Sequence, residues 1–266
     1  MHQTDLQIMG ILNITPDSFF DGNKYTHEKA ILQRVEQIIK EGGDIVDIGA
    51  FSSRPGAHFV TEQEERKRLI PFLTKIVKEF PDILISIDTY RSNIAKEAIE
   101  NGAGMINDIS AGNLDENMFK TIADLQVPYI MMHMQGTPEN MQKKPTYKEV
   151  INDILVYFLQ KIEALNQLGF DRIIIDPGFG FGKTLEHNYE ILERLDEFKI
   201  LKKPVLVGLS RKSMLYKVLG GTPQEMLNAT SIANTIAVMK GASFLRVHDV
   251  KEAGEIKKII SQLKNI

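Results

Sequence analysis

Short aliphatic runs alternate along the chain with longer segments in which apolar residues recur every three or four positions. The short runs are apolar at nearly every position, which is typical of strands that are covered on both faces in a parallel sheet. The longer segments have the period of amphipathic helices. The pattern predicts eight strands, at residues 8–12, 45–48, 83–87, 105–106, 129–132, 173–175, 205–207 and 244–247.

A helical segment follows each predicted strand, and several of these segments have a clear start. Thr61 and Glu64 form a capping box ahead of a long apolar stripe. Ser92 is a candidate cap for the helix after the third strand. Thr222 and Glu225 predict the start of the helix that precedes the last strand. Strand and helix therefore alternate along the whole chain.

Eight strand-then-helix units in 266 residues favour an α/β fold of one kind, a closed (β/α)8 TIM barrel. A doubly wound open sheet is the alternative, but its phosphate-binding fingerprint G-x-G-x-x-G does not follow the first predicted strand. No linker or low-complexity segment divides the chain. We therefore expect residues 1–266 to form a single domain.

The composition excludes several classes of protein. Lys+Arg 32 against Asp+Glu 35 gives a net charge of −3, so the overall charge does not favour nucleic acid or an anionic membrane as a partner. The absence of cysteine excludes disulfides, thiolate metal sites and a cysteine nucleophile. The sequence has no signal-peptide pattern and no apolar run near the ~18 residues of a membrane span, so we expect a cytoplasmic protein.

Polar side chains gather where the predicted strands end. In a TIM barrel the carboxyl ends of all the strands meet at one face, where active sites form. The residues at these ends, in chain order, are Asn13, Ser52, Ser53, Arg54, Asp88, Asn107, His133, Asp176, Ser210, Arg211, Lys212, Arg246 and His248. This set is too polar for a barrel core, so we expect a functional site at that face.

The set combines two kinds of chemistry. Asp88, Asn107 and Asp176 offer hydrogen-bond acceptors and an amide, which suit a heterocycle that presents N–H groups. The cations of the set suit a phosphate or a diphosphate, and they are Arg54, Lys212, Arg246 and His248.

The most distinctive strand end is RIIIDPGFGFGK, at residues 172–183. Its glycines let the backbone approach a flat ligand closely, with Phe179 and Phe181 available to cover that ligand. Two polar neighbours of the predicted site have simpler explanations. We expect His133 to be a structural hydrogen-bonding residue, and Arg211 to form a salt bridge behind the site.

Eight short motifs together resemble the dihydropteroate synthase family. They are ILNITPDSFFDG, SSRPGA, IDTY, NDIS, MHMQGTPENMQ, DPGFGFGK, GLSRKS and RVHDV, in the family's order and across nearly the whole chain. Each motif is weak alone, but the ordered set is highly specific. One departure lies in the second motif, where the family often has threonine and this chain has Ser53.

The resemblance implies a TIM-barrel transferase of folate biosynthesis. Such an enzyme joins (7,8-dihydropterin-6-yl)methyl diphosphate to 4-aminobenzoate, releases pyrophosphate and uses Mg2+. The resemblance also implies a homodimer formed through the outer helices, with residues 224–240 as the candidate segment.

The resemblance further assigns roles to residues at the motif positions. The positions that hold the pterin correspond to Asp88, Asn107, Asp176 and Lys212, with Gly208 and either Met134 or Phe181 along its faces. Asp88, Asp176, Lys212 and Arg54 are the expected catalytic residues.

The other assignments concern the diphosphate, the metal and the aminobenzoate. Arg246 and His248 match the diphosphate-binding pair. Asn13 matches the Mg2+ contact, with Asp21 or Asp17 as its helper. The expected aminobenzoate contacts are Ser53, Arg54, Pro55, Phe19, Phe181 and Ser213.

Three other functions remain compatible with a polar barrel mouth. A pterin-dependent methyltransferase domain would share the pterin pocket but would have no use for a diphosphate site. A Schiff-base aldolase would use Lys212 as its nucleophile, and a non-catalytic barrel would only bind a phosphorylated ligand.

Overall fold

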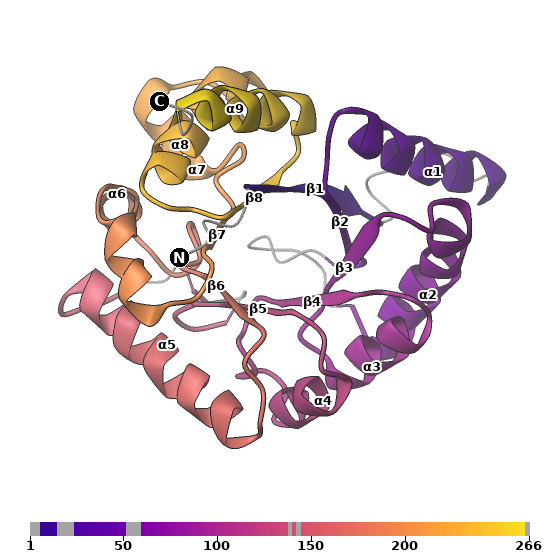
Figure 1. Cartoon of the computed structure of the whole chain (residues 1–266). Helices are drawn as coiled ribbons and strands as arrows, with labels where there is room; N and C mark the ends of the chain where they lie inside the picture. Colours follow the sequence, from indigo (N-terminus) through magenta and orange to yellow (C-terminus); the bar gives the residue numbers. More distant parts are fainter. Residues whose placement is uncertain (1–5, 15–23, 52–59, 138–139, 142–144, 264–266) are drawn as a thin grey trace.

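The computed structural model describes residues 6–14, 24–51, 60–137, 140–141 and 145–263. Within these residues, eight parallel strands form a ring and the helices lie around its outside (Figure 1). The chain passes around the ring once, from β1 to the C-terminal helix (Figure 1). The predicted (β/α)8 TIM barrel is therefore confirmed.

The strands follow one another around the barrel in sequence order. Hydrogen-bonded neighbours run β6-β5-β4-β3-β2-β1-β8-β7, and a parallel bridge between Ile175 and Val205 joins the two ends of this series. A doubly wound sheet reverses its strand order partway, so that alternative is wrong. The strands are β1 Gln7–Asn13, β2 Ile45–Gly49, β3 Leu84–Asp88, β4 Met105–Asp108, β5 Tyr129–Met132, β6 Ile173–Asp176, β7 Leu206–Val207 and β8 Phe244–Val247.

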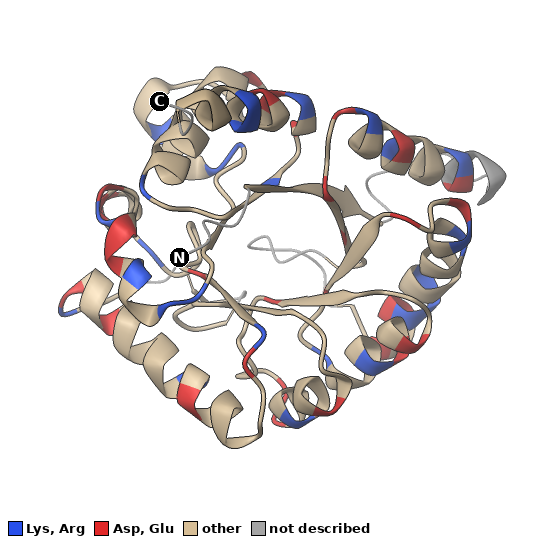
Figure 2. Ribbon diagram, viewed as in Figure 1, with Lys and Arg blue, Asp and Glu red and all other residues tan. Residues whose placement is uncertain are grey.

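The helices form the outer layer, and the charged residues lie mainly on them (Figure 2). None of the described helices is long and apolar enough to cross a membrane. The helices are α1 Lys24–Lys40, α2 Glu62–Glu79, α3 Ser92–Glu100, α4 Met118–Leu125, α5 Val150–Gln167, α6 Leu185–Glu193, α7 Ser213–Leu219, α8 Leu227–Met239 and α9 Val250–Leu263, with 3-10 helices η2 Leu195–Leu201 and η3 Pro223–Glu225.

The structure agrees with only some of the predicted helix starts. The capping box of Thr61 with Glu64 is present at α2. Ser92 does not cap α3, because it is the first helical residue and its own N–H donates to Asp115 Oδ2 at 2.7 Å. The Thr222 box caps the short helix η3, and α8 begins two residues after that helix ends.

Two apolar layers build the barrel. The larger cluster joins strand residues such as Val46 and Ile48 to helix residues such as Ile38, so it fills the space between strands and helices. A second cluster lies inside the ring of strands and receives side chains from seven of them. Its members are Met9, Ile45, Met105, Ile130, Ile174 and Leu206, with Phe244 packed against them.

Candidate active site

On most of the strands, the barrel interior changes from apolar to polar over one two-residue step. Residues i and i+2 of a strand face the same side, so the positions that follow the inner apolar layer also face the interior. Asp47 is in register with Ser86, and Asp88 with Asn107. The interior polar residues are Asn13 of β1, Asp47 of β2, Ser86 and Asp88 of β3, Asn107 of β4, Asp176 of β6 and Arg246 of β8.

Arg246 is the centre of an ion-pair network in this polar layer. Its Nε donates to Asp47 Oδ2 at 2.6 Å, and its Nη2 donates to Asp88 Oδ2 at 2.9 Å. Asp47 also accepts from Ser86 Oγ at 2.6 Å and from Asn107 Nδ2 at 3.1 Å. Burial disfavours the guanidinium charge, but Asp47 and Asp88 outweigh it and raise the pKa of Arg246.

The two carboxylate oxygens of Asp88 differ, because only Oδ2 is hydrogen-bonded within the described residues. Its Oδ1 is buried and has no hydrogen-bond partner among the described residues. Burial raises the pKa of Asp88 to about 7, while Arg246 opposes this shift and Asp47 adds to it. A Cβ on Gly49 would lie 3.5 Å from Asp88 Oδ2 and 3.6 Å from Asn13 Oδ1. The backbone at Gly49 therefore lies close to one side-chain oxygen of each of these two residues.

Asp176 and Lys212 form the opposite charged part of the site. Asp176 is buried, and its Oδ1 accepts from the Gly178 N–H at 2.8 Å. Burial raises the pKa of Asp176, and the charge of Lys212 opposes that shift. Burial lowers the pKa of Lys212 to about 8, and the charge of Asp176 opposes that shift. The Lys212 ammonium donates to the Phe179 carbonyl and lies 4.9 Å from the ring centroid of Phe181.

The lysine at the end of the glycine-rich loop is a structural residue of the site. Lys183 Nζ lies 3.0 Å from His133 Nδ1 and donates to the Phe181 carbonyl at 3.0 Å. Burial lowers the pKa of Lys183 to about 7, and burial together with Lys183 lowers the pKa of His133 to about 2. His133 is therefore a neutral, buried hydrogen-bonding residue, in agreement with the expectation that it is structural.

Glycine is required at the start of this loop. Gly178 has φ 73°, and a Cβ there would lie 2.0 Å from the His133 carbonyl oxygen. The loop after β6 therefore passes against the end of β5 more closely than any side chain allows. This close approach brings Phe181 to the barrel mouth.

An apolar wall borders the polar layer at the mouth. Its buried members are methionines and an isoleucine, with three aromatic rings packed against them. Flat heterocycles bind well between such a wall and an opposing polar or cationic side chain. The wall consists of Ile109, Met132, Met134 and Met141, with Phe51, Tyr90 and Phe181.

His248 extends the rim beyond Arg246, whereas Arg211 is paired with Asp249. His248 Nδ1 lies 3.0 Å from Ser210 Oγ, so the ring is held at the end of β8. Arg211 points away from the site, and its Nε and Nη2 bond to the two carboxylate oxygens of Asp249 at 3.0 and 2.5 Å. The expected salt bridge behind the site is therefore present.

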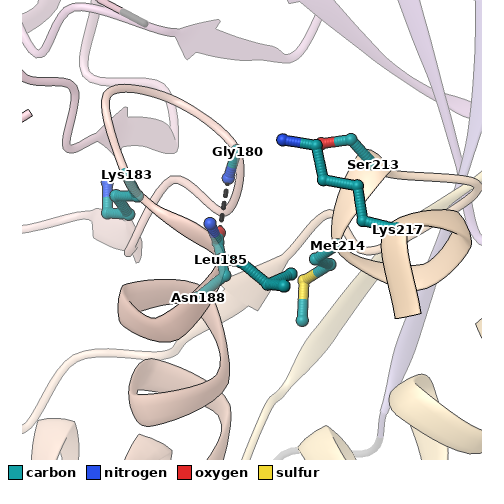
Figure 3. Close-up of a pocket in the computed structure, with 7 residues that line it drawn as sticks. All are labelled: Gly180, Lys183, Leu185, Asn188, Ser213, Met214 and Lys217. Carbon is teal, nitrogen blue, oxygen red and sulfur yellow. Dashed lines mark hydrogen bonds between the residues drawn. The ribbon is translucent and has the colours of Figure 1, made fainter. Parts of the chain in front are cut away.

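A small pocket adjoins the site between α6, α7 and the loop after β6 (Figure 3). The Gly180 N–H donates to Asn188 Oδ1 at 2.7 Å and fixes the loop against α6. Ser213, an expected aminobenzoate contact, lines this pocket together with Lys217 one helical turn later. The lining residues are Gly180, Lys183, Leu185, Asn188, Ser213, Met214 and Lys217.

The structure brings the expected residues of the described chain to one end of the barrel. Ser53, Arg54 and Asp21 lie outside the described residues, as do Asp17, Phe19 and Pro55, so their expected roles stay predictions. Among the described residues, no group of three or more His, Cys, Asp or Glu side chains could hold a metal ion.

Asp47 is the candidate that sequence reasoning missed. It stands two residues after Ile45 in the aliphatic strand IVDIG, and a lone carboxylate in such a strand is costly unless it is paired. The period-2 rule places it on the same side as Ile45, inside the barrel. This pattern could have identified it as an interior charge.

The chain is similar to known proteins in both sequence and fold. The model of the pterin binding enzyme family matches residues 9–248. A dihydropteroate synthase of Escherichia coli K12 is 40% identical over 255 residues, which cover 95% of this chain and 90% of that protein. A dihydropteroate synthase of Streptococcus pyogenes is 43% identical over 260 residues, covering 96% of this chain and 95% of that protein.

Solved structures agree with these relatives. Yersinia pestis dihydropteroate synthase, in a complex with a sulfonamide drug, has a TM-score of 0.92 at 39% identity and covers 98% of this chain and 95% of its own. Xanthomonas albilineans dihydropteroate synthase in complex with 7,8-dihydropteroate has a TM-score of 0.88 at 32% identity. The match covers 100% of this chain and 96% of that protein.

These relatives decide between the candidate functions that the sequence left open. All of them are named dihydropteroate synthases. Their names therefore support the synthase and not the pterin methyltransferase or the Schiff-base aldolase. The chain therefore belongs to the dihydropteroate synthase family of pterin-binding enzymes, which are transferases of folate synthesis.

Proposed function

We propose that this chain condenses (7,8-dihydropterin-6-yl)methyl diphosphate with 4-aminobenzoate to give 7,8-dihydropteroate and pyrophosphate. The observation that carries the proposal is the juxtaposition, in one polar layer, of buried acceptors with the cation Arg246. The acceptors suit the N–H groups of a pterin, and the cation suits a diphosphate. Structures of a Xanthomonas albilineans relative contain 4-aminobenzoic acid and 7,8-dihydropteroate, which supports one proposed substrate and the proposed product.

The pterin edge would bind to the acceptors of the polar layer. Asp88 Oδ1 and the Asp176 carboxylate can accept hydrogen bonds from the ring N–H groups, and both carboxylates favour the positive charge that develops on the ring as the leaving group departs. Lys212 and the wall that contains Met134 and Phe181 would hold the two faces of the ring.

The leaving group needs positive charge where its own negative charge grows. The carbon–oxygen bond to the diphosphate breaks while the aryl amine nitrogen forms the new carbon–nitrogen bond and loses a proton. Arg246 and Lys212 lie beside the pterin acceptors and would stabilise the departing pyrophosphate, with His248 and Arg54 as predicted partners. The amine is neutral at pH 7, so positioning of the reactants supplies much of the rate enhancement.

Mg2+ is part of the proposal, and the donor set of the described residues fits it. Asn13 Oδ1 lies beside Gly49 near Asp88, so oxygen ligands are present at the rim. Mg2+ is commonly held by one or two protein oxygens together with substrate phosphates and water. When bound, the ion would neutralise charge on the leaving group. Asp21 remains a predicted second ligand.

A coupled assay tests the function directly. The purified chain, supplied with the dihydropterin diphosphate, 4-aminobenzoate and Mg2+, should release pyrophosphate and form 7,8-dihydropteroate in equal amounts. A chelator should stop the release, and added Mg2+ should restore it. Release of no pyrophosphate, or equal release without 4-aminobenzoate, would contradict the proposal.

Pterin affinity is expected to fall as the pH is lowered through about 7. The Asp88 carboxylate must be ionised to accept hydrogen bonds, and burial raises its pKa to about 7. Below that value, affinity for a dihydropterin without a diphosphate should fall by up to about tenfold per pH unit. Calorimetric titration between pH 5.5 and 8.5 measures this slope. Asp88→Asn should bind more weakly and should lose the slope, and a slope that survives this change would assign the titration to another group.

We further propose a homodimer formed through α7 and α8. Large apolar side chains on these helices are exposed, among them Leu219 at 67%, Ile232 at 54% and Met239 at 63%. Exposed apolar side chains of neighbouring helices often mark an interface. Sedimentation should show a dimer that Ile232→Glu dissociates, whereas Val156→Glu on α5 should leave it intact. The cytoplasmic location expected from the sequence stays a prediction.

A further inference from the structure

We infer that Asp47 is a positioning residue that couples the pterin side of the site to the diphosphate side through Asn107 and Arg246. This inference rests on the proposed function and adds a residue that acts through its neighbours. Asn107 and Arg246 come from β4 and β8, and Asp47 on β2 contacts both. Among the described side chains, Asp47 alone is hydrogen-bonded to both of them.

The Asp47 carboxylate lies at the meeting point of four strands. It is fully buried, and its donors are 39, 60 and 199 residues away in the sequence. Oδ1 accepts from Ser86 Oγ at 2.6 Å. Oδ2 accepts from both Asn107 Nδ2 at 3.1 Å and Arg246 Nε at 2.6 Å. Both residues assigned to substrate binding therefore share a single oxygen atom.

This shared oxygen decides which atoms of the two residues face a ligand. Because the Asn107 amide nitrogen donates to Asp47, the amide oxygen is the end that remains to accept a hydrogen bond from a pterin N–H. Because Arg246 Nε donates to Asp47, the terminal guanidinium nitrogens remain for Asp88 and for phosphate oxygens. Asp47 thus sets the orientation of an acceptor and of a cation together.

The Asp47→Asn substitution tests the charge of this side chain separately from its shape. The asparagine oxygen can keep the acceptor role toward Asn107 and Arg246, while its amino group can donate to Ser86, whose hydroxyl rotates to accept. Asp47→Asn therefore preserves the packing and removes the charge that strengthens the bond to Arg246. Asp47→Ala removes both the packing and the charge. Ser86→Ala removes only the hydroxyl that donates to Asp47 Oδ1.

Asp108→Asn is the matched control for the loss of a buried carboxylate. Asp108 is also fully buried and lies on β4, next to Asn107 in the sequence. Its oxygens accept from Ser110, from the Gly112 N–H and from the Tyr129 hydroxyl, none of which belongs to the proposed site. Its replacement tests whether any buried charge on this sheet affects binding.

The experiment measures the affinity of the chain for two ligands, each of which reports on one side of the site. A dihydropterin without a diphosphate reports on Asn107, and pyrophosphate reports on Arg246. Asp47→Asn should weaken the binding of both, by about 10-fold each, which is the loss expected for weakening a charged hydrogen bond. Asn107→Ala should weaken the pterin far more than pyrophosphate, and Arg246→Lys should weaken pyrophosphate far more than the pterin. Asp108→Asn should change either affinity by less than about twofold.

Steady-state kinetics supplies a readout that a purely structural role would not change. In Asp47→Asn, kcat should fall by about 10- to 100-fold and KM for the pterin diphosphate should rise, while KM for 4-aminobenzoate stays unchanged. If Asp47→Asn binds both ligands as the unmodified chain does, or resembles Asp108→Asn, the inference is wrong. If the unmodified chain itself releases no pyrophosphate, the proposed function fails instead, and the two binding titrations still test the coupling.

Discussion

Arg246→Lys should lower kcat by about 10²- to 10³-fold while the chain stays folded. The guanidinium holds Asp47 with Nε and Asp88 with Nη2, and the single ammonium of lysine cannot reproduce this fork. The charge would remain in the barrel but would be misplaced relative to the departing pyrophosphate, and a loss of this size is typical when one electrostatic contact to a developing charge is removed. Pyrophosphate release under saturating substrates measures the effect.

Arg211→Lys is the matched control for this change. Arg211 pairs with Asp249 behind the site, so its replacement should leave kcat within about threefold of the unmodified value. An Arg246→Lys variant with the same kcat as Arg211→Lys would remove Arg246 from the reaction.

A comparison of Arg246→Ala with Arg246→Lys separates the effect on turnover from the effect on stability. From the sequence, Arg246 at a polar barrel mouth is expected to affect turnover more than stability. The structure alters this expectation, because the loss of the cation leaves Asp47 and Asp88 buried without their partner, which costs about 3–5 kcal/mol. Urea unfolding should show this loss for alanine and a much smaller one for lysine.

Asp176→Asn should weaken pterin binding by about 1.5–3 kcal/mol, the range for a hydrogen bond to a charged group. Asparagine can still accept the Gly178 N–H, so the turn after β6 should remain and the unfolding free energy should change little. The lost charge is the one that favours Lys212 in its ammonium form, so the pKa of Lys212 should fall further. Titration with a dihydropterin lacking the diphosphate isolates the binding effect from turnover.

Asp171→Asn serves as the comparison. Asp171 lies five residues earlier, is largely exposed and pairs with Lys203 on the outside of the barrel. Its replacement should leave pterin affinity unchanged. Equal affinities for Asp176→Asn and Asp171→Asn would show that the pterin binds elsewhere.

Much of the architecture could be predicted from local patterns. Residues 244–247 and 129–132 were predicted as strands with the observed bounds, because short, largely apolar runs that end at a polar residue are typical of buried strands. The fourth strand was predicted too short, since Asn107 and Asp108 are polar yet belong to β4 and are buried. A polar strand end is buried when other strands supply its partners, and hydropathy does not show this.

The sequence by itself determined that eight strands alternate with helices and that Asp88, Asn107, Asp176, Lys212 and Arg246 stand at or near the strand ends. Topology then requires these residues to share one face, because parallel strands of a barrel all point the same way. The tertiary structure alone decided which of them are bonded. Asp47 meets Arg246 across 199 residues, and Lys183 meets His133 across 50, because strand register and side-chain length select each partner.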